Sequence, residues 1–345
     1  MTISYSDLLI LDDQKIILDV RSPREFAHAH IPGAVSLPLF DDQERAHVGT
    51  TYKQVSREMA IKIGLDYFGP KMRKLVESVE ELTNSGDLHV VVHCWRGGMR
   101  SAAVAWLLRF YGFQVSVLEG GYKAFRHWVI NNLTQEYSFY LIGGKTGSGK
   151  TKILHELAES GESIIDFEGL ASHKGSAFGN IGMPDQPSQE MFENIVSLEV
   201  YHKSRSHQVI WVEDESQRIG AVNIPGDLYR EMSKSPVFFL EIPFEKRLQN
   251  IINEYGRLDK LKLIEATLRL QKRLGGVETQ NVIHSITQDN IEAAFTILLK
   301  YYDKFYLKSL GKKNQSKIQF IECESVDPTK NAEKLMTFPF QTAYL

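Results

Sequence analysis

The sequence has 345 residues, 43% of them hydrophobic and 24% charged, which is typical of a folded globular protein with about two domains. The formal net charge of −3 excludes a surface uniformly covered in positive charge, although it allows a local basic patch for nucleic acid. The sequence shows no signal peptide and no apolar run near the roughly 20 residues that span a bilayer. Its two cysteines, Cys94 and Cys323, match neither a disulfide framework nor a zinc spacing. We therefore expect a cytoplasmic protein without a membrane segment.

The first part of the chain alternates short apolar runs with amphipathic stretches, which is the pattern of a parallel α/β sheet. Strands are predicted at residues 15–20, 34–37 and 88–94, and a strand with its turn at 115–121. Helices are predicted at residues 56–65, 70–82, 101–113 and 122–133. These elements predict a first domain over residues 1–132.

A second domain is predicted over residues 133–345, and it opens with a strand, a glycine-rich loop and a helix at 139–159. Further strands are predicted at residues 162–169, 208–216, 236–243 and 317–325. Helices are predicted at residues 244–255, 266–276 and 290–310. The expected fold class is therefore α/β in both domains, with a helical C-terminal part.

The segment HCWRGGMRS, residues 93–101, places Cys94 between a predicted strand and a predicted helix. Ligands bind at this position in open α/β sheets, and loop N–H groups beside a helix N-terminus form an anion cradle that favours a thiolate. Three interpretations stay open: a buried structural cysteine, a Cys-x5-Arg phosphatase loop and a sulfurtransferase loop that carries a persulfide. The catalytic candidates are Cys94, Arg96, Gly97, Gly98 and Arg100.

Two flanking segments favour the sulfurtransferase interpretation. LDVRSPREFAHAHIPGAVSLP, residues 18–38, resembles the N-terminal signature of rhodanese domains, and LEGGYKAF, residues 118–125, resembles their C-terminal end. The resemblance implies a rhodanese-like parallel-sheet domain at the N-terminus. Asp19 and Arg21 lie in the first signature and are expected to support the cysteine loop.

The segment GKTGSGKT, residues 144–151, matches the phosphate-binding loop (P-loop) pattern G-x-x-x-x-G-K-[ST] between a predicted strand and helix. Its glycines let backbone N–H groups approach a diphosphate, Lys150 neutralises the charge and Thr151 could hold Mg²⁺. The pattern predicts a P-loop NTPase-like α/β domain without implying nucleotide hydrolysis. The residues predicted to bind the diphosphate are Gly144, Gly147, Ser148, Gly149, Lys150 and Thr151.

Acidic residues at the ends of two predicted strands are candidates to support the P-loop. Glu213, Asp214 and Glu215 follow one of these strands, and Asp166 and Glu168 follow the other. Because exposed acids at strand ends are commonly only solvated charges, both interpretations stay open.

Several separate segments together resemble the tRNA 2-selenouridine synthase family. They are the rhodanese signature, HCWRGGMRS, the P-loop, and residues 48–64, 166–179, 186–194 and 211–220. The resemblance implies a transferase that replaces sulfur by selenium in wobble 2-thiouridine of tRNA. It also implies selenophosphate as the selenium donor and an S-geranyl-2-thiouridine intermediate formed from geranyl diphosphate.

The resemblance assigns roles to particular residues. It implies that Cys94 carries or guides selenium while the rest of its loop cradles selenophosphate, and that His173 and Ser216 have supporting roles. We hypothesise that the P-loop binds the diphosphate of geranyl diphosphate rather than ATP, because the chemistry needs a diphosphate substrate and no phosphoryl transfer. We expect no tightly bound cofactor and no metal other than Mg²⁺ at Thr151.

The implied tRNA substrate requires a surface that contacts the anticodon loop, for which RNA-binding proteins use basic grooves and aromatic stacking. Tyr255 and Trp95 could stack on a base, and residues 312–317 form a further basic cluster. Lysines and arginines on helices are more often simply solvated. The candidates for tRNA contact in the helical C-terminal part are Lys246, Arg247, Arg257, Arg269, Lys272 and Arg273.

The resemblance also suggests a monomer that receives selenium from a selenophosphate synthase. Two alternatives from other classes stay open. One is a sulfurtransferase or Cys-x5-Arg phosphatase regulated by a nucleotide-binding domain, and the other is a non-enzymatic, nucleotide-gated binding module. The intact Cys94 and Arg100 count against the second alternative.

Overall fold

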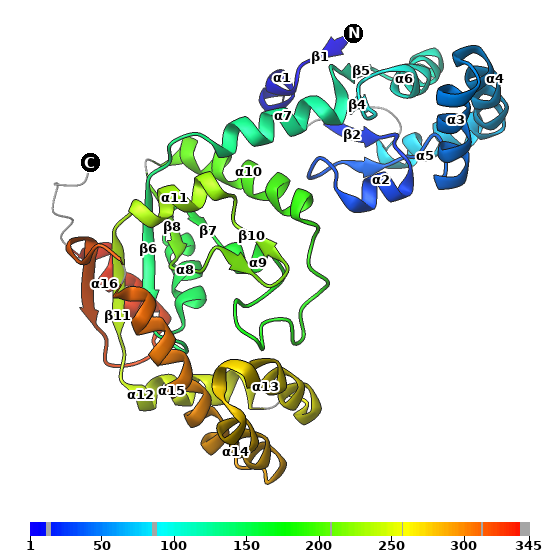
Figure 1. The fold of residues 1–345 in the computed structure, drawn as a ribbon. Helices are drawn as coiled ribbons and strands as arrows, with labels where there is room; N and C mark the ends of the chain where they lie inside the picture. The colour runs from blue at the N-terminus through cyan, green and yellow to red at the C-terminus, as the bar shows by residue number, and fades with distance from the viewer. Residues whose placement is uncertain (12–14, 85–87, 208, 257, 312, 339–345) are drawn as a thin grey trace. The chain divides into compact units, whose positions relative to one another are not determined.

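The computed structural model describes residues 1–11, 15–84, 88–207, 209–256, 258–311 and 313–338 (Figure 1). The described chain forms two compact units. The first unit comprises Met1–Asn132 together with Glu193–Ser197, and the second contains the remainder from Leu133 onward. Among the described helices, none is long and apolar enough to cross a membrane. Both units contain parallel sheets flanked by helices, which confirms the predicted α/β class.

Five strands form the sheet of the first unit: β1 (Thr2–Ile3), β2 (Lys15–Asp19), β3 (Val35–Ser36), β4 (His89–His93) and β5 (Val115–Leu118). They run parallel in the order β1-β5-β4-β2-β3. The central strand β4 contributes Val90, Val91 and Val92, all 0% exposed, as expected when both faces of a parallel sheet are covered. Strand β1 was not predicted, because two residues are too few to show a periodicity.

The four helices predicted in the first unit are present, and the unit also contains helices at Tyr5–Ile10, Pro23–His28 and Asp42–Gln54 that were not predicted. The helix predicted at 101–113 begins two residues earlier, with Gly98 as its N-cap, so Arg100 lies in its first turn. The helix that begins at Pro23 is preceded by Ser22, which forms a capping box with Glu25. The elements are α1 (Tyr5–Ile10), α2 (Pro23–His28), α3 (Asp42–Gln54), α4 (Arg57–Phe68), the 3-10 helix η1 (Gly69–Lys71), α5 (Met72–Leu82), α6 (Met99–Tyr111) and α7 (Gly121–Leu133).

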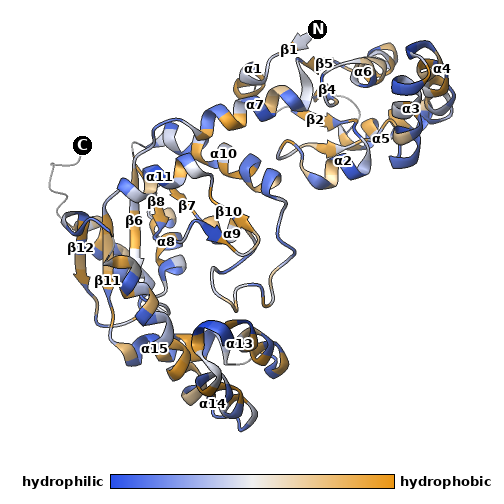
Figure 2. Cartoon of the chain, viewed as in Figure 1, coloured by the Kyte–Doolittle hydropathy of each residue, from blue (hydrophilic) through white to orange (hydrophobic). Residues whose placement is uncertain are grey.

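The sheet of the second unit contains β6 (Phe139–Gly144), β7 (Ile164–Ile165), β8 (Ile210–Glu213), β11 (Val237–Glu241) and β12 (Ile318–Glu322). These strands run parallel in the order β12-β11-β6-β8-β7, and they carry mainly hydrophobic residues at β6, β11 and β12 (Figure 2). The loop after the central strand β6 therefore lies at the carboxyl edge of the sheet, beside the end of β8. A separate antiparallel pair consists of β9 (Arg218–Ile219) and β10 (Val222–Asn223).

The strand predicted at 162–169 is shorter in the structure. Asp166 accepts a hydrogen bond from the Gly169 backbone N–H (2.8 Å) and caps a short helix, so the strand ends at Ile165. The last helices pack around their own core, which includes Leu263, Val282 and Leu298. The helices of the second unit are α8 (Lys150–Glu159), α9 (Phe167–Leu170), α10 (Gln189–Ser206), α11 (Gly226–Lys234), α12 (Phe244–Tyr255), α13 (Lys260–Leu274), α14 (Gly276–Thr287), α15 (Ile291–Leu310), the 3-10 helix η2 (Gln315–Lys317) and α16 (Pro328–Thr337).

Candidate functional site

Cys94 follows strand β4 directly and is only 4% exposed. Its carbonyl oxygen accepts a hydrogen bond from the Tyr122 backbone N–H (2.9 Å), and its Sγ lies 3.3 Å from the Ser101 hydroxyl. The same hydroxyl lies 3.0 Å from the Gly98 carbonyl oxygen, so its single proton can serve one acceptor at a time. The strand, the loop and the start of α6 thus hold the thiol in one position.

Two glycines allow the cysteine loop to lie against the turn before α7. Gly97 has φ +65°, and a Cβ there would lie 2.7 Å from the Leu118 carbonyl oxygen. Gly121 has φ +58°, and its Cβ would lie 2.3 Å from the Cys94 carbonyl oxygen and 2.5 Å from the Gly97 nitrogen. Because a real Cβ does not come this close to backbone atoms, both positions require glycine.

The surroundings of Cys94 favour the thiolate. Burial raises the pKa of the thiol, but hydrogen bonds from the Ser101 side chain and backbone, another from the Arg96 backbone and the charge of Arg100 outweigh it. The net effect lowers the pKa of Cys94. A lowered pKa is the property expected of a nucleophilic cysteine and not of an inert structural one.

The arginines of the cysteine loop differ in their contacts. The Arg100 guanidinium donates a hydrogen bond to Glu25 Oε2 (2.8 Å), and Arg45 Nε lies 3.5 Å from the same oxygen. Burial raises the pKa of Glu25, but the opposing effect of Arg100 and the Ser22 backbone N–H is larger. The pKa of Glu25 is therefore below its ordinary value. Arg96 is exposed. Arg100 therefore already holds a carboxylate, which leaves Arg96 and the loop amides as the more accessible anion donors.

Asp19 and Arg21 form a buried ion pair in the first unit. Arg21 Nη2 lies 2.6 Å from Asp19 Oδ2, donates to the Ala29 carbonyl oxygen (2.7 Å), and its guanidinium lies 3.9 Å from the centroid of the Tyr122 ring. His93 Nε2 is 3.7 Å from Asp19 Oδ2, and burial lowers the pKa of this histidine to about 4. Of these residues only His93 adjoins the cysteine loop in sequence. The ion pair contacts His93 and the ring of Tyr122, whose backbone N–H donates to the Cys94 carbonyl oxygen (2.9 Å), which is a supporting position.

The P-loop connects β6 to α8 in the second unit. Its glycines Gly144, Gly147 and Gly149 have φ of +154°, +83° and +73°. The Ser148 hydroxyl donates to the Lys145 carbonyl oxygen (2.5 Å), which closes the loop on itself. The Tyr306 hydroxyl of α15 accepts a hydrogen bond from the Gly144 N–H (3.1 Å), so α15 contacts the start of the loop. The loop therefore has the glycine turns that a P-loop requires, and its binding of an anion stays a prediction.

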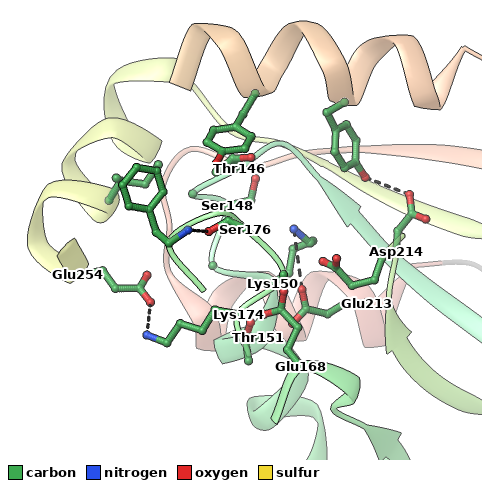
Figure 3. A pocket seen from close by; sticks show the side chains of 18 of the residues that line it. Thr146, Ser148, Lys150, Thr151, Glu168, Lys174, Ser176, Glu213, Asp214 and Glu254 are labelled. Carbon is green, nitrogen blue, oxygen red and sulfur yellow. Dashed lines mark hydrogen bonds and ion pairs between the residues drawn. The ribbon is translucent and has the colours of Figure 1, made fainter. Parts of the chain in front are cut away.

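Lys150 faces a group of carboxylates (Figure 3). Its Nζ lies 3.8 Å from Glu213 Oε2, and the charges of Glu213, Glu215 and Glu168 outweigh burial to raise the pKa of the lysine. Burial, followed by repulsion from Glu215 and Glu213, raises the pKa of Glu168 to about 9. Burial also raises the pKa of Glu215 to about 7. The lysine is therefore charged, and the carboxylates beside it hold protons readily.

Gly175 brings two of these carboxylates together. It has φ +62°, and a Cβ there would lie 2.2 Å from Glu168 Oε1 and 3.2 Å from Glu215 Oε2. The two side chains are therefore close neighbours across one glycine. The neighbouring Lys174 pairs with Glu254 (3.0 Å), as Figure 3 shows.

The raised pKa of Glu168 leads to a prediction about stability. The pKa of Glu168 is higher in the folded protein than in the unfolded chain. Its contribution to the free energy of unfolding is therefore fully present at acidic pH and is lost as pH rises from about 4.5 towards 9. We expect Glu168→Gln to raise the Tm of the ligand-free protein by about 2–4 °C at pH 8 and by less at pH 5. Thermal unfolding at both pH values measures this, with the exposed Glu159→Gln as control. An equal gain at both pH values would contradict the assignment.

The P-loop opens into a cavity of about 650 Å³ (Figure 3). One part of its lining is polar and contains residues of the P-loop, Lys174, Ser176 and the carboxylates described above. Another part is apolar and comes mainly from the loop before α10, from α12 and from α15. It includes Phe178, Ile251, Tyr255, Phe295, Leu298 and Leu299.

The structure brings together most of the residues predicted around the P-loop. Asp166, Glu168, Glu213, Glu215 and Ser216 all line the cavity. His173 does not line it among the described residues. Instead this histidine is 9% exposed and lies against Gly179 and Gly220, where a Cβ would come within 2.8 and 2.7 Å of its ring.

Among the residues predicted to contact tRNA, Arg247 is corrected by the structure. It is 2% exposed, pairs with Asp303 through two hydrogen bonds (2.9 and 2.8 Å) and donates to the Thr146 carbonyl oxygen (3.0 Å). A fully paired, buried guanidinium is not available to RNA, because its partners already satisfy its donors. The helix pattern placed this residue on the surface, and only the later helix α15 supplies its partner.

The remaining basic candidates are on the surface or outside the described residues. Lys246, Lys272 and Arg273 are exposed. Arg269 is also exposed and donates to the Ala177 carbonyl oxygen (3.0 Å) and to Asn180 Oδ1 (3.2 Å), so it holds the loop that precedes α10. Arg257 and Lys312, the first residue of the second basic cluster, lie outside the described residues. Their contact with tRNA stays a prediction.

Several residues at these sites were not predicted from the sequence. Ser101 stands seven residues after Cys94 and is separated from it by a loop, so spacing alone could not place its hydroxyl beside the thiol. Tyr306 was not predicted either; it donates to Asp214 Oδ2 (3.0 Å), one of the predicted acids, and Lys313 also pairs with that aspartate. Tyr255, which could stack on a base according to the sequence, lines the cavity, and its contact with tRNA stays a prediction.

Comparisons with known proteins cover both units. Residues 7–127 match the rhodanese-like domain family, and residues 137–328 match the family described as the tRNA 2-selenouridine synthase AAA domain. The tRNA 2-selenouridine synthase of Shewanella frigidimarina (strain NCIMB 400) is 32% identical over 344 residues, covering 90% of this chain and 92% of that protein. Those of Shewanella sediminis (strain HAW-EB3) and Hydrogenovibrio crunogenus (strain DSM 25203 / XCL-2) are each 34% identical, over 88% of this chain and 90% and 91% of theirs.

The rhodanese match contains Cys94 and its loop, and the second match contains the P-loop and the carboxylates beside it. The relatives match nearly the full length of the chain, so the similarity covers both units. The chain therefore belongs to the tRNA 2-selenouridine synthase family.

Proposed function

We propose that this protein replaces sulfur by selenium in wobble 2-thiouridine of tRNA, with selenophosphate as donor and an S-geranyl intermediate formed from geranyl diphosphate. The observation that carries the geranyl part of the proposal is the cavity, in which a P-loop faces an apolar wall. A ligand with a diphosphate head and a hydrocarbon tail matches both parts of this lining. The names of the relatives support the tRNA modification.

In this proposal the P-loop binds the diphosphate head. Backbone N–H groups and Lys150 neutralise its charge, and the apolar wall excludes water from the hydrocarbon chain. The thiocarbonyl sulfur then bonds to C1 of the geranyl chain as the bond from C1 to the diphosphate oxygen breaks. The charge that develops on the leaving diphosphate is the charge that Lys150 stabilises.

Thr151 is the residue that would hold Mg²⁺ in this site. It borders the cavity beside Glu213, and a threonine hydroxyl is a suitable ligand type. The ion would supply further positive charge to the diphosphate. No other cofactor is needed for the proposed chemistry.

Cys94 performs the selenium step in this proposal. The geranylated sulfur is a better leaving group than a thiocarbonyl, so a selenium nucleophile can displace it. The selenium of selenophosphate bonds to C2 of the uracil as the C2–S bond breaks and geranyl thiolate leaves, and water then cleaves the P–Se bond and releases phosphate. Cys94, with its lowered pKa, would guide the selenium in this step, and Arg96 and the loop amides would bind the phosphate group. We also propose the tRNA anticodon loop and a selenophosphate synthase as partners of a monomeric, cytoplasmic enzyme.

The Cys-x5-Arg phosphatase interpretation receives less support from the geometry. A phosphatase loop aims its arginine at the bound phosphate, whereas Arg100 is held by Glu25 at 2.8 Å. The rhodanese match over residues 7–127 also favours chalcogen chemistry.

Equilibrium binding tests the identity of the P-loop ligand. We expect geranyl diphosphate to bind at least about 100-fold more tightly than inorganic diphosphate, because each buried methylene contributes about 0.8 kcal/mol. ATP should bind more weakly than geranyl diphosphate and should not be turned over. Binding and hydrolysis of ATP without competition from geranyl diphosphate would contradict the proposal.

A further inference from the structure

The apolar wall of the cavity starts at the P-loop itself. A Cβ at Gly147 would lie 2.8 Å from Ile251 Cδ1 and 2.9 Å from the Arg247 carbonyl oxygen, and Asn250 Nδ2 donates to the Gly147 carbonyl oxygen (3.1 Å). Helix α12 therefore packs directly on Gly147 of the P-loop. Ile251 both touches the P-loop and lines the cavity, so the apolar lining meets the loop at this side chain.

One turn further along α12, aromatic rings replace this aliphatic contact. Tyr255 follows Ile251 by four residues, which is about 6 Å along a helix. The rings of Phe178, Tyr255 and Phe295 have pairwise centroid distances of 6.4, 6.4 and 6.2 Å. All three rings line the cavity, and we call them the aromatic cluster.

The aromatic cluster is held in place from several sides. Phe178 and Phe295 are 4% and 5% exposed and belong to the core of the last helices. The Phe178 N–H donates to the Ser176 hydroxyl (3.1 Å), and Lys174 Nζ lies 5.5 Å from the centroid of the Tyr255 ring. Because the rings come from three separate segments that pack together, they form a fixed wall and not a loose surface.

We propose that the aromatic cluster closes the far end of the cavity and selects a two-isoprene chain over longer prenyl chains. This inference rests on the proposed function, because it assumes a prenyl diphosphate with its head on the P-loop. The chain then runs past Ile251 and ends against the cluster. A three-isoprene chain would have to displace these closely packed rings. Removal of one ring leaves a cavity, because the surrounding core relaxes only partly, and the longer chain can occupy it.

The test compares full-length wild-type protein with Phe295→Ala and the milder Phe178→Leu. For each protein, prenyl transfer to 2-thiouridine tRNA is measured with geranyl and with farnesyl diphosphate, alongside equilibrium binding of both. We expect the wild type to favour geranyl diphosphate by at least about tenfold in kcat/KM, and Phe295→Ala to lower this ratio by about tenfold or more. Phe178→Leu should lower it by less, which preserves the test if Phe295→Ala does not fold.

Phe305→Ala provides the matched control, because Phe305 lies on the same helix and is 45% exposed. Its geranyl-to-farnesyl ratio should equal that of the wild type. Unchanged ratios in variants that still transfer geranyl groups would overturn the inference while leaving the proposed function intact. Absence of prenyl transfer by the wild type would refute the proposed function itself. A loss of ATP binding in Phe295→Ala, with unchanged chain selection, would assign the cluster to a nucleotide base instead.

Discussion

Lys150→Ala is expected to remove both the geranylated and the selenated wobble nucleoside. Lys150 lies in the P-loop, its charged form is favoured by the surrounding carboxylates, and in the proposed mechanism it neutralises the leaving diphosphate. Loss of one such charge donor commonly costs about 10²–10³ in rate. Because geranylation precedes selenation in the proposed sequence, both products should disappear together. Mass spectrometry of wobble nucleosides from a deletion strain complemented with the variant measures this outcome.

The exposed Lys300→Ala serves as the charge-matched control for this experiment. Lys300 is a residue of α15 and not of the P-loop. Its replacement should leave both nucleosides at the wild-type level. The folded state of Lys150→Ala is checked by thermal unfolding of the purified protein. Normal selenouridine in cells that contain folded Lys150→Ala would refute the role of the P-loop.

Cys94→Ala is expected to separate the two steps. The variant should lose selenouridine, whereas the geranylated nucleoside should persist and accumulate, because the P-loop and its cavity remain intact. The thiol is assigned to selenium transfer on the basis of its lowered pKa and its contact with Ser101 at 3.3 Å. The same nucleoside analysis measures both products in one sample.

Cys323→Ala is the control for the loss of a thiol. Cys323 follows β12, is buried, and burial raises its pKa, so it has the properties of an inert core cysteine. This variant should retain both nucleosides. Selenouridine at the wild-type level in the Cys94→Ala strain would refute the assignment of Cys94.

The sequence predicted those parts of the sites that depend on local chain geometry. The loop after β4 and the P-loop each require a strand, several glycines and a helix within a short segment, so their residues could be identified from spacing alone. The carboxylates at the end of β8 were also predictable, because parallel strands adjacent in a sheet end at the same edge. Local patterns therefore located the cysteine loop and the polar side of the cavity.

The apolar side of the cavity could not be predicted in this way. Phe178, Tyr255 and Phe295 are separated by long stretches of sequence, and each resembles an ordinary core residue of its own segment. The burial of Arg247 could not be predicted either. Its helix suggested an exposed cation, because its partner Asp303 lies 56 positions later in the sequence. Contacts between distant helices decide both cases, and periodicity within one helix carries no information about them.

The contact between Gly97 and Gly121 has a consequence for how this protein can vary. The cysteine loop and the turn before α7 are separate motifs in the sequence, but in the folded chain they occupy one volume that admits no side chain from either. Substitution at either glycine must therefore move the backbone that presents the Cys94 thiol. The two motifs form a single steric unit, and a productive change in one would require a matching change in the other.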